Sequence, residues 1–234
     1  MNEIGTALRH MLLREANVLY PRPRPRTLQR AGARLDALAD AAPALLCMLA
    51  EPWQETIARQ PHAREVLHCC ALVHLYARIL DDAVDENLPC HRLALLRAQP
   101  LYWRAVARLG QLSSLTAGAG EQLVQETIEA VLEDDSASSP KYWGAKNHHL
   151  LLVPLLLSGD AAAFSEARDF LSHALCLLQA ADELDQGDTT DANIIPRLAL
   201  ETERRDVILH LAERGWKSLA WHLCTITREL LNRL

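Results

Sequence analysis

Residues 72–86 read LVHLYARILDDAVDE, a stretch that begins as an apolar helix and ends in a cluster of acids. On a helix, side chains three or four positions apart lie on one face, so Asp81, Asp82 and Asp85 project from about one turn. Unpaired carboxylates this close repel one another, whereas Mg²⁺ prefers carboxylate oxygens and keeps several waters. The stretch therefore predicts half of a metal site, with the other half elsewhere in the chain.

The composition favours an all-α fold. Half of the 234 residues are hydrophobic, glycine is sparse at 9, and no stretch alternates strictly between apolar and polar residues. Leucine and alanine are good helix formers, and strands would need alternation or β-branched runs. We expect one all-α domain over residues 1–234, because the length suits one large domain and no break is strong enough to separate two.

Charge and patterning exclude several classes of protein. The net charge of −6 argues against nucleic acid as the main partner. We expect no signal peptide, since charged residues interrupt the first apolar run, and no membrane span, since no run reaches about 18 apolar residues. The 6 cysteines lack the spacing of a metal site or of a secreted disulfide framework, which indicates a cytoplasmic protein.

Two adjacent cysteines, Cys69 and Cys70, lie in an apolar helix that also carries His68 and His74. This set suits either a zinc site or buried structural thiols. The apolar surroundings favour the buried thiols.

Periodicity and capping signals place the helices. The expected ranges are 2–19, 27–41, 43–59, 61–86, 90–109, 121–132, 140–154, 160–185, 194–213 and 216–233. We expect Pro43 to start a helix, Pro100 to break or bend one, and Pro154 to kink one. In 90–109 the core candidates are Leu93, Leu96, Leu101 and Val106.

Residues 21–26 read PRPRPR, and alternating prolines favour an extended path over a helix. The segment is either a solvated linker or a basic strap that contacts diphosphate, and the linker is the preferred interpretation.

Residues 177–188 read LLQAADELDQGD and repeat the design of the first cluster. Asp182 and Asp185 are three apart, and Gln179 lies one turn earlier on the same face. The C-terminal end of a helix is the unfavourable end for carboxylates, which points to a bound cation. Either end alone suits a solvated helix terminus, but two such ends favour one shared metal site. The acids at 133–135 lie among serine and proline and indicate a solvated loop.

Lys146 lies between the two clusters in the sequence. Two carboxylate helices, Mg²⁺ and a lysine form a set that binds diphosphate, because the metal neutralises phosphate oxygens and lets diphosphate depart as an anion. A carbocation left behind needs a dry apolar cavity to avoid capture by water. The leucine- and alanine-rich helix faces can supply its walls.

With these residues in view, the chain resembles the class I isoprenoid synthases over about residues 60–190. His74 to Asp85 resembles the first aspartate-rich motif of the trans-polyprenyl diphosphate synthases, a histidine seven residues before DDxxD. RILDD, residues 78–82, resembles the RxxDD of squalene and phytoene synthases. KNHHLL at 146–151, the glycine-containing break at 158–160, and Gln179 with Asp182 follow in the order of the polyprenyl synthases.

The resemblance implies a bundle of about ten helices around a central apolar cavity, and a homodimer. It implies about three Mg²⁺ ions with diphosphate bound, held by carboxylates. The implied metal ligands are Asp81, Asp82, Asp85, Asp182 and Asp185. Substrate binding falls to Arg78, Lys146 and Gln179, and catalysis to Asp81, Asp82 and Lys146.

The chain departs from the family pattern in three places. The second motif lacks one acid, which Asp188 can replace. The glycine- and lysine-containing segment that binds isopentenyl diphosphate is not visible, and of the arginine pair after the first motif only Arg92 remains. The allylic site therefore looks kept and the homoallylic site lost.

Three functions are compatible with these residues. The preferred one is a terpene-synthase-like enzyme that ionises one allylic prenyl diphosphate to a hydrocarbon or alcohol. The second is a prenyltransferase with isopentenyl diphosphate or another acceptor. The third is a non-catalytic helical subunit of a prenyl synthase complex. The low aromatic content, 5%, weakens the first, since aromatic faces hold migrating cations.

Overall fold

The protein is described by a computed structural model that covers residues 3–19, 26–85, 89–112, 118–133, 140–185 and 204–231. Of these residues 94% lie in helices and none in strands, which confirms the all-α prediction. Within the same ranges, every helix is too short or too polar to cross a lipid bilayer. The segment 20–25 and Asp188 lie outside them, as do the side chains of Asp85 and Asp185.

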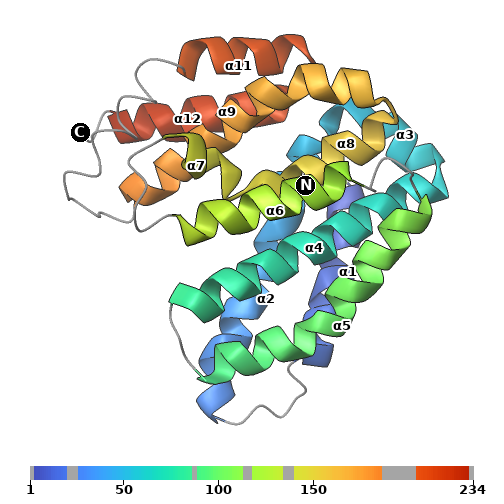
Figure 1. Cartoon of the computed structure of the whole chain (residues 1–234), viewed down its shortest axis with the longest axis vertical. Coiled ribbons are helices and arrows are strands. Elements are labelled where there is room, and N and C mark those ends of the chain that lie inside the picture. Colours follow the sequence, from blue (N-terminus) through green and yellow to red (C-terminus); the bar gives the residue numbers. More distant parts are fainter. Residues whose placement is uncertain are drawn as a thin grey trace. The chain divides into compact units, whose positions relative to one another are not determined.

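The chain forms two compact units. The first contains residues 1–50 and 54–114, and the second contains 51–53 and 115–234. Figure 1 labels the helices of both units along the chain. A single domain over 1–234 stays a prediction, because two compact units can belong to one domain.

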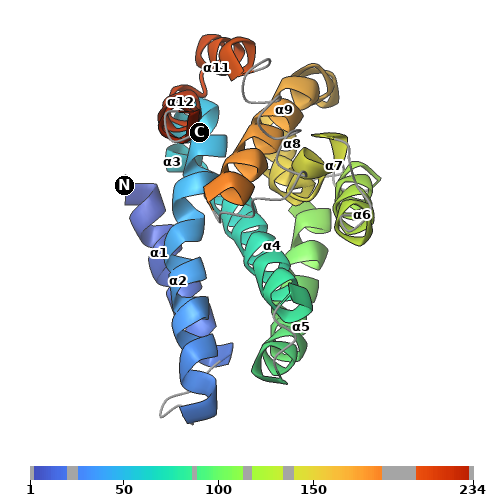
Figure 2. The same ribbon diagram turned by 90° about the vertical axis from the view of Figure 1, so that its left-hand side faces the viewer.

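The first unit is built around α4. Its helices are α1 (Glu3–Leu19), α2 (Arg26–Leu49), α3 (Gln54–Arg59), α4 (Pro61–Asp85) and α5 (Pro89–Leu112). Pro61 opens α4, a position where its missing N–H costs nothing. In Figure 2, α4 lies between the α1–α2 pair and α5. Burial runs along its length, with Leu67, Leu75 and Ile79 inside, so the first acid cluster ends a firmly packed helix.

Two prolines of this unit lie inside helices. Pro43 lies inside α2, so the prediction that it starts a helix is wrong, and Pro100 lies inside α5, so it does not break that helix. An internal proline removes one helical hydrogen bond and costs about 3 kcal/mol. In α2 the cost is offset by tertiary packing, because Leu46 and Leu49 beyond the proline are fully buried.

The core face of α5 also differs from the prediction. Its buried apolar residues, among those that the structure describes, are the small Ala94, Ala98 and Ala105, together with Leu109. The predicted core residues Leu93, Leu96 and Val106 are exposed instead. The small face lets α5 pack closely on α4, which places the larger side chains on the opposite, solvent side.

The second unit is built around α9 (Ala161–Asp185), which packs against other helices of this unit. The other elements of the second unit are α6 (Ala119–Leu132), α7 (Pro140–Ala145), α8 (Leu152–Ser158), α11 (Arg204–Glu213), α12 (Lys217–Leu231) and the 3₁₀ turns η1 (Glu51–Trp53) and η4 (His148–Leu151). In Figure 2, α9 runs between α7 and α8 on one side and α11 and α12 on the other.

Aromatic packing ties η1 to the second unit. The ring of Trp216 meets those of Trp53 and Phe170 edge-on, with centroids 5.7 Å and 5.6 Å away. Glu51 accepts hydrogen bonds from the backbone N–H and the hydroxyl of Ser218, at 2.7 Å and 3.0 Å. A carboxylate at this end stabilises α12, because the first N–H groups of a helix lack partners within it.

The predicted helix over 140–154 is three elements in the structure. It stops after Ala145, turns through Lys146 and Asn147, and resumes as η4 and then α8. Gly159 ends α8 with φ +63°, a conformation that glycine adopts without a Cβ clash. Asp160 then caps α9, accepting from the N–H groups of Ala162 at 2.9 Å and Ala163 at 3.2 Å. The predicted break at 158–160 is confirmed.

Candidate functional site

The first acid cluster ends α4, and each of its two described carboxylates faces an arginine. Asp81 accepts from Nη1 of Arg78, three residues earlier on the same helix, at 2.8 Å. Asp82 lies 3.4 Å from the guanidinium of Arg34 on α2. Both aspartates are partly buried. The repulsion expected between neighbouring acids is therefore offset by two guanidinium groups.

Arg34 is a residue that the sequence analysis missed. It lies 48 residues before Asp82, and its Nε and Nη2 approach Oδ2 and Oδ1 in a forked arrangement. Both distances, 3.4 Å, are long for a hydrogen bond, so the pair is held loosely. No local pattern in the sequence marks Arg34, because its contact with Asp82 depends on how α2 packs against α4.

Two buried histidines flank the first cluster. Nδ1 of His91 on α5 lies 3.2 Å from the backbone carbonyl of Asp82, so this nitrogen carries the proton and donates to one of the last carbonyls of α4. His74 lies two turns before Asp82. Burial, reinforced by the nearby Arg78, lowers the pKa of His74 to about 4. His74 is therefore neutral at physiological pH.

The second acid cluster ends α9 in the other unit. Gln179 is half-buried, and Asp182, one turn later, is exposed. The side-chain amide of Asn147 donates to Oε1 of Gln179 at 2.9 Å. This bond brings the turn that carries Lys146 against the acidic end of α9. Two segments that the sequence analysis singled out separately, about 146–151 and 177–188, therefore meet in the structure.

Close packing of α7 against α9 fixes the position of the turn that carries Lys146. A Cβ added to Gly144 would lie 2.7 Å from the backbone oxygen of Ser172 and 3.1 Å from the backbone nitrogen of Cys176. Only glycine allows α7 to approach α9 this closely. The N–H of Asn147 donates back to the Gly144 carbonyl at 3.0 Å, so the position of Lys146 follows from that of α7.

A polar network on the other side of the turn joins three elements. Nδ1 of His148 lies 2.6 Å from Oε2 of Glu126 on α6, and Arg168 on α9 donates to the same oxygen. Burial would raise the pKa of Glu126, but the hydrogen bonds from Arg168 and His148 outweigh it and lower the pKa. Burial lowers the pKa of His148. Neutral His148 therefore donates to an ionised Glu126.

The sequence analysis also missed this network. Its members come from three elements that are far apart in the chain, and each looks like an ordinary helix-surface residue. The histidine pair at 148–149 is the sequence feature that could have indicated this network. The N–H of His149 adds a further tie, donating to Oγ1 of Thr127 on α6 at 3.1 Å.

Cys69 and Cys70 are buried thiols, as the sequence favours. Cys69 and Cys70 are both inside α4, and burial raises the pKa of Cys69 to about 11. Their thiolate forms, which bind metal, are therefore disfavoured.

The carboxylate oxygens of Asp81 and Asp82 suit Mg²⁺, which prefers hard oxygen ligands. Among the side chains that the structure describes, no three histidines, cysteines, aspartates or glutamates gather as a metal site. The full predicted ligand set needs Asp85 and Asp185, whose side chains lie outside that part. Asp81, Asp82 and Arg78 belong to the first unit, and Lys146, Gln179 and Asp182 to the second. The shared metal site stays a prediction.

Comparison with known proteins adds no family assignment. No protein-family model, curated protein or solved structure matches the chain.

Proposed function

We propose that this protein is a Mg²⁺-dependent class I isoprenoid synthase that ionises an allylic prenyl diphosphate and releases diphosphate. The product is a terpene hydrocarbon or alcohol. The proposal rests on the ordered set of motifs over residues 74–185 and on the chemistry of the side chains that carry them.

One observation supports the proposal most directly. The bond from Asn147 to Gln179 joins residues 32 apart in the chain, and both lie in segments that the family motif order assigns to diphosphate binding. Helix packing alone does not require a lysine-bearing turn to meet an acid-tipped helix. A site that holds a diphosphate between a cation and a metal-binding carboxylate does require it.

The proposed roles follow from the local chemistry. Asp81 and Asp82 would hold Mg²⁺, which when bound neutralises the diphosphate oxygens and stabilises the leaving anion. Lys146 would donate to a terminal phosphate oxygen, with Gln179 and Asn147 fixing the turn behind it. Arg78 and Arg34, released from their aspartates by the metal, would be free to bind diphosphate oxygens.

A substrate panel tests the proposal. The purified chain is incubated with Mg²⁺ and geranyl, farnesyl or geranylgeranyl diphosphate singly, and released diphosphate and organic products are measured. We expect diphosphate release with a hydrocarbon or alcohol from one substrate. Asp81→Asn with Asp82→Asn should lower turnover by at least about a thousandfold, because metal ligands contribute several kcal/mol to such steps.

The matched control is Asp169→Asn, which removes an exposed carboxylate near the start of α9. It should retain wild-type turnover. Activity that survives in the Asp81→Asn, Asp82→Asn protein would refute the site assignment, and no turnover with any substrate would refute the function.

Arg34 favours a second candidate, a prenyltransferase. The chain lacks the glycine- and lysine-containing segment that binds isopentenyl diphosphate in the family. The sequence therefore predicted that the homoallylic diphosphate has no binding site. A guanidinium beside Asp82 supplies a cation for such a group. Diphosphate release only when isopentenyl diphosphate is added would select this function.

Co-purification with a larger synthase, without turnover, would select the non-catalytic subunit.

A further inference from the structure

The outer face of α5 carries a row of large apolar side chains in solvent. The exposed fractions are 39% for Leu93, 63% for Leu96, 68% for Trp103 and 39% for Val106. Their spacing of three, seven and three residues keeps them on one side of the helix. The row extends for roughly 20 Å, since each helical residue rises 1.5 Å. These residues form what we call the α5 outer face.

Arginines border this face, and α5 contains no acid. Arg92 and Arg97 are exposed near its N-terminal half. Farther along, Arg104 pairs with Glu15 at 3.1 Å and Arg108 with Glu65 at 2.8 Å. Glu15 and Glu65 balance the charges of those two arginines, so the exposed guanidinium groups of Arg92 and Arg97 are the part of α5 that an anionic surface would meet.

Aromatic packing supports the central tryptophan. The rings of Tyr102 and Tyr76 stack at 4.5 Å, and Trp103 meets Tyr102 edge-on at 6.4 Å. The Trp103 side chain therefore has a rigid base formed by α4 and α5, while its outer surface stays in solvent. A tryptophan with an apolar body and a polar N–H suits the boundary between lipid and water.

We propose that the α5 outer face docks the protein on an anionic lipid surface, without crossing it. Leu96 and Trp103 would enter the headgroup–acyl boundary, and Arg92 and Arg97 would remain at the phosphates, as cationic side chains do beside a membrane. This inference does not rest on the proposed function.

A second copy of the chain is the competing occupant. The exposed apolar area is on the order of 400 Å², against about 800 Å² per partner in a stable protein interface. The complementary surface would be α6, where Ile128 and Leu132 are exposed beside acids. A contact between α5 and α6 of different copies is heterologous and builds rings or open chains. The observations therefore favour lipid.

Vesicle sedimentation with the full chain tests the proposal. We expect binding to phosphatidylcholine vesicles that contain phosphatidylglycerol and little binding to phosphatidylcholine alone. Leu96→Gln with Trp103→Gln should lower the partition coefficient by at least about tenfold. Arg92→Gln with Arg97→Gln should lower it roughly 30-fold, since each cation near the surface contributes about 1 kcal/mol.

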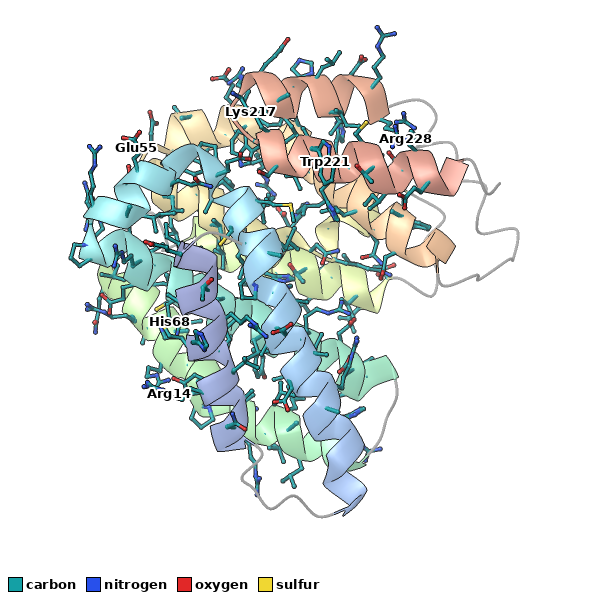
Figure 3. The ribbon with its side chains drawn as sticks, turned by 180° about the vertical axis from the view of Figure 1, so that it is seen from behind. Arg14, Glu55, His68, Lys217, Trp221 and Arg228 are labelled. Atoms are coloured by element: carbon teal, nitrogen blue, oxygen red, sulfur yellow. The ribbon has the colours of Figure 1, made fainter. Side chains whose placement is uncertain are left out.

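The matched control is Leu132→Gln with Trp221→Gln. Leu132 is 76% exposed on α6 and Trp221 is 71% exposed on α12, where Figure 3 labels it between Lys217 and Arg228. This variant removes the same two side-chain types from other surfaces. It should bind within about twofold of wild type, because those side chains do not lie on the docking face.

Brominated lipid gives a second readout that avoids the polar substitutions. Quenching of tryptophan emission on anionic vesicles should disappear in Trp103→Phe and persist in Trp221→Phe. Absence of wild-type binding, quenching that survives Trp103→Phe, or an equal loss in the control would overturn the proposal. So would a wild-type oligomer in solution that Leu96→Gln with Trp103→Gln converts to a monomer, because a second copy would then cover the face.

Discussion

Arg34 on α2 places Nε 3.4 Å from Oδ2 of Asp82 and Nη2 3.4 Å from Oδ1. A guanidinium and a divalent cation compete for the same carboxylate oxygens. If Asp82 binds Mg²⁺, the ion must displace Arg34. Because the contact is long and the arginine side chain is 46% exposed, little free energy is needed to displace Arg34 from Asp82.

Arg34→Gln should therefore strengthen binding of Mg²⁺ alone. An exposed pair of this kind contributes up to about 1 kcal/mol, so the affinity should rise by up to about fivefold. Titration calorimetry with Mg²⁺ measures the change. Arg205→Gln, an exposed arginine on α11, should leave the affinity unchanged. Weaker metal binding in Arg34→Gln would show that the arginine does not compete with the ion.

Asn147→Ala should reduce both stability and turnover. The substitution leaves Oε1 of half-buried Gln179 without its 2.9 Å donor, which costs about 1 kcal/mol of unfolding free energy. Lys146 loses its fixed position as well, and we expect turnover to fall by about tenfold or more. Denaturant unfolding and the diphosphate-release assay measure the two effects.

Asn17→Ala is the matched control for that prediction. Its side chain also donates a 2.9 Å hydrogen bond, to the carbonyl of Leu13 within α1, but lies in an exposed position. It should change neither quantity by much. Normal turnover in Asn147→Ala would mean that the Asn147–Gln179 bond serves packing alone.

His74 should make the protein acid-sensitive. Its pKa is about 4 in the folded state against 6.5 ordinarily. As the pH falls, His74 therefore binds a proton in the unfolded chain before it does so in the folded protein. The free energy of unfolding decreases as pH falls from about 6.5 towards 4. Because a pKa shift of one unit corresponds to about 1.36 kcal/mol, the full decrease in the free energy of unfolding is about 3 kcal/mol.

Comparing wild type with His74→Gln isolates this contribution from those of the other histidines. Denaturant unfolding at pH 7.5, 5.5 and 4.5 measures the free energy of unfolding of both proteins. As the pH falls, this free energy should decrease less in His74→Gln than in wild type, and the difference should be roughly half to all of the 3 kcal/mol. An equal pH dependence in both proteins would show that His74 titrates in the folded state as it does in the unfolded chain.

Gly144→Ala should destabilise the second unit. The added Cβ would lie 2.7 Å from a backbone oxygen of α9, which cannot move without shifting the helix. We expect a loss of about 1–3 kcal/mol, typical of overpacking. Gly110→Ala is the control, because nothing lies within 4 Å of a Cβ there. In α5 that change should stabilise the protein by up to about 1 kcal/mol. Thermal unfolding of both variants checks the contrast.

The long helices were predictable from sequence because their signals are strong and local. The 61–86 and 160–185 predictions match α4 and α9 closely, since Pro61 opens one and Asp160 caps the other. The predicted break at Pro43 was wrong because propensity is local, and the burial of Leu46 and Leu49 that overrides it is tertiary.

The α5 prediction failed for a different reason. Hydrophobicity assigns Leu93, Leu96 and Val106 to the core, whereas close helix packing selects the small side chains of Ala94, Ala98 and Ala105. Sequence periodicity cannot rank a large-residue face against a small-residue face on the same helix. The exposed face that results is the one proposed to dock on lipid.

The candidate site was predictable one segment at a time. Aspartates at helix ends, a lysine and a glutamine stand out from spacing alone. Arg34, and the network of Glu126, His148 and Arg168, did not stand out, because those contacts join elements separated by 22 to 48 residues. Pairings over such distances depend on helix packing, which spacing within one helix does not encode.

The proposed function predicts that the carboxylates of Asp82 and Asp182 both support Mg²⁺-dependent binding of a prenyl diphosphate. The most direct test is calorimetric titration of Mg²⁺ into the protein saturated with a non-ionisable farnesyl S-thiolodiphosphate, for wild type, Asp82→Asn, Asp182→Asn and the control Asp169→Asn. We predict that Asp82→Asn and Asp182→Asn each abolish the same analogue-dependent metal binding, while Asp169→Asn retains it. Wild-type metal binding in either of the first two variants would contradict the metal-binding role proposed for that aspartate.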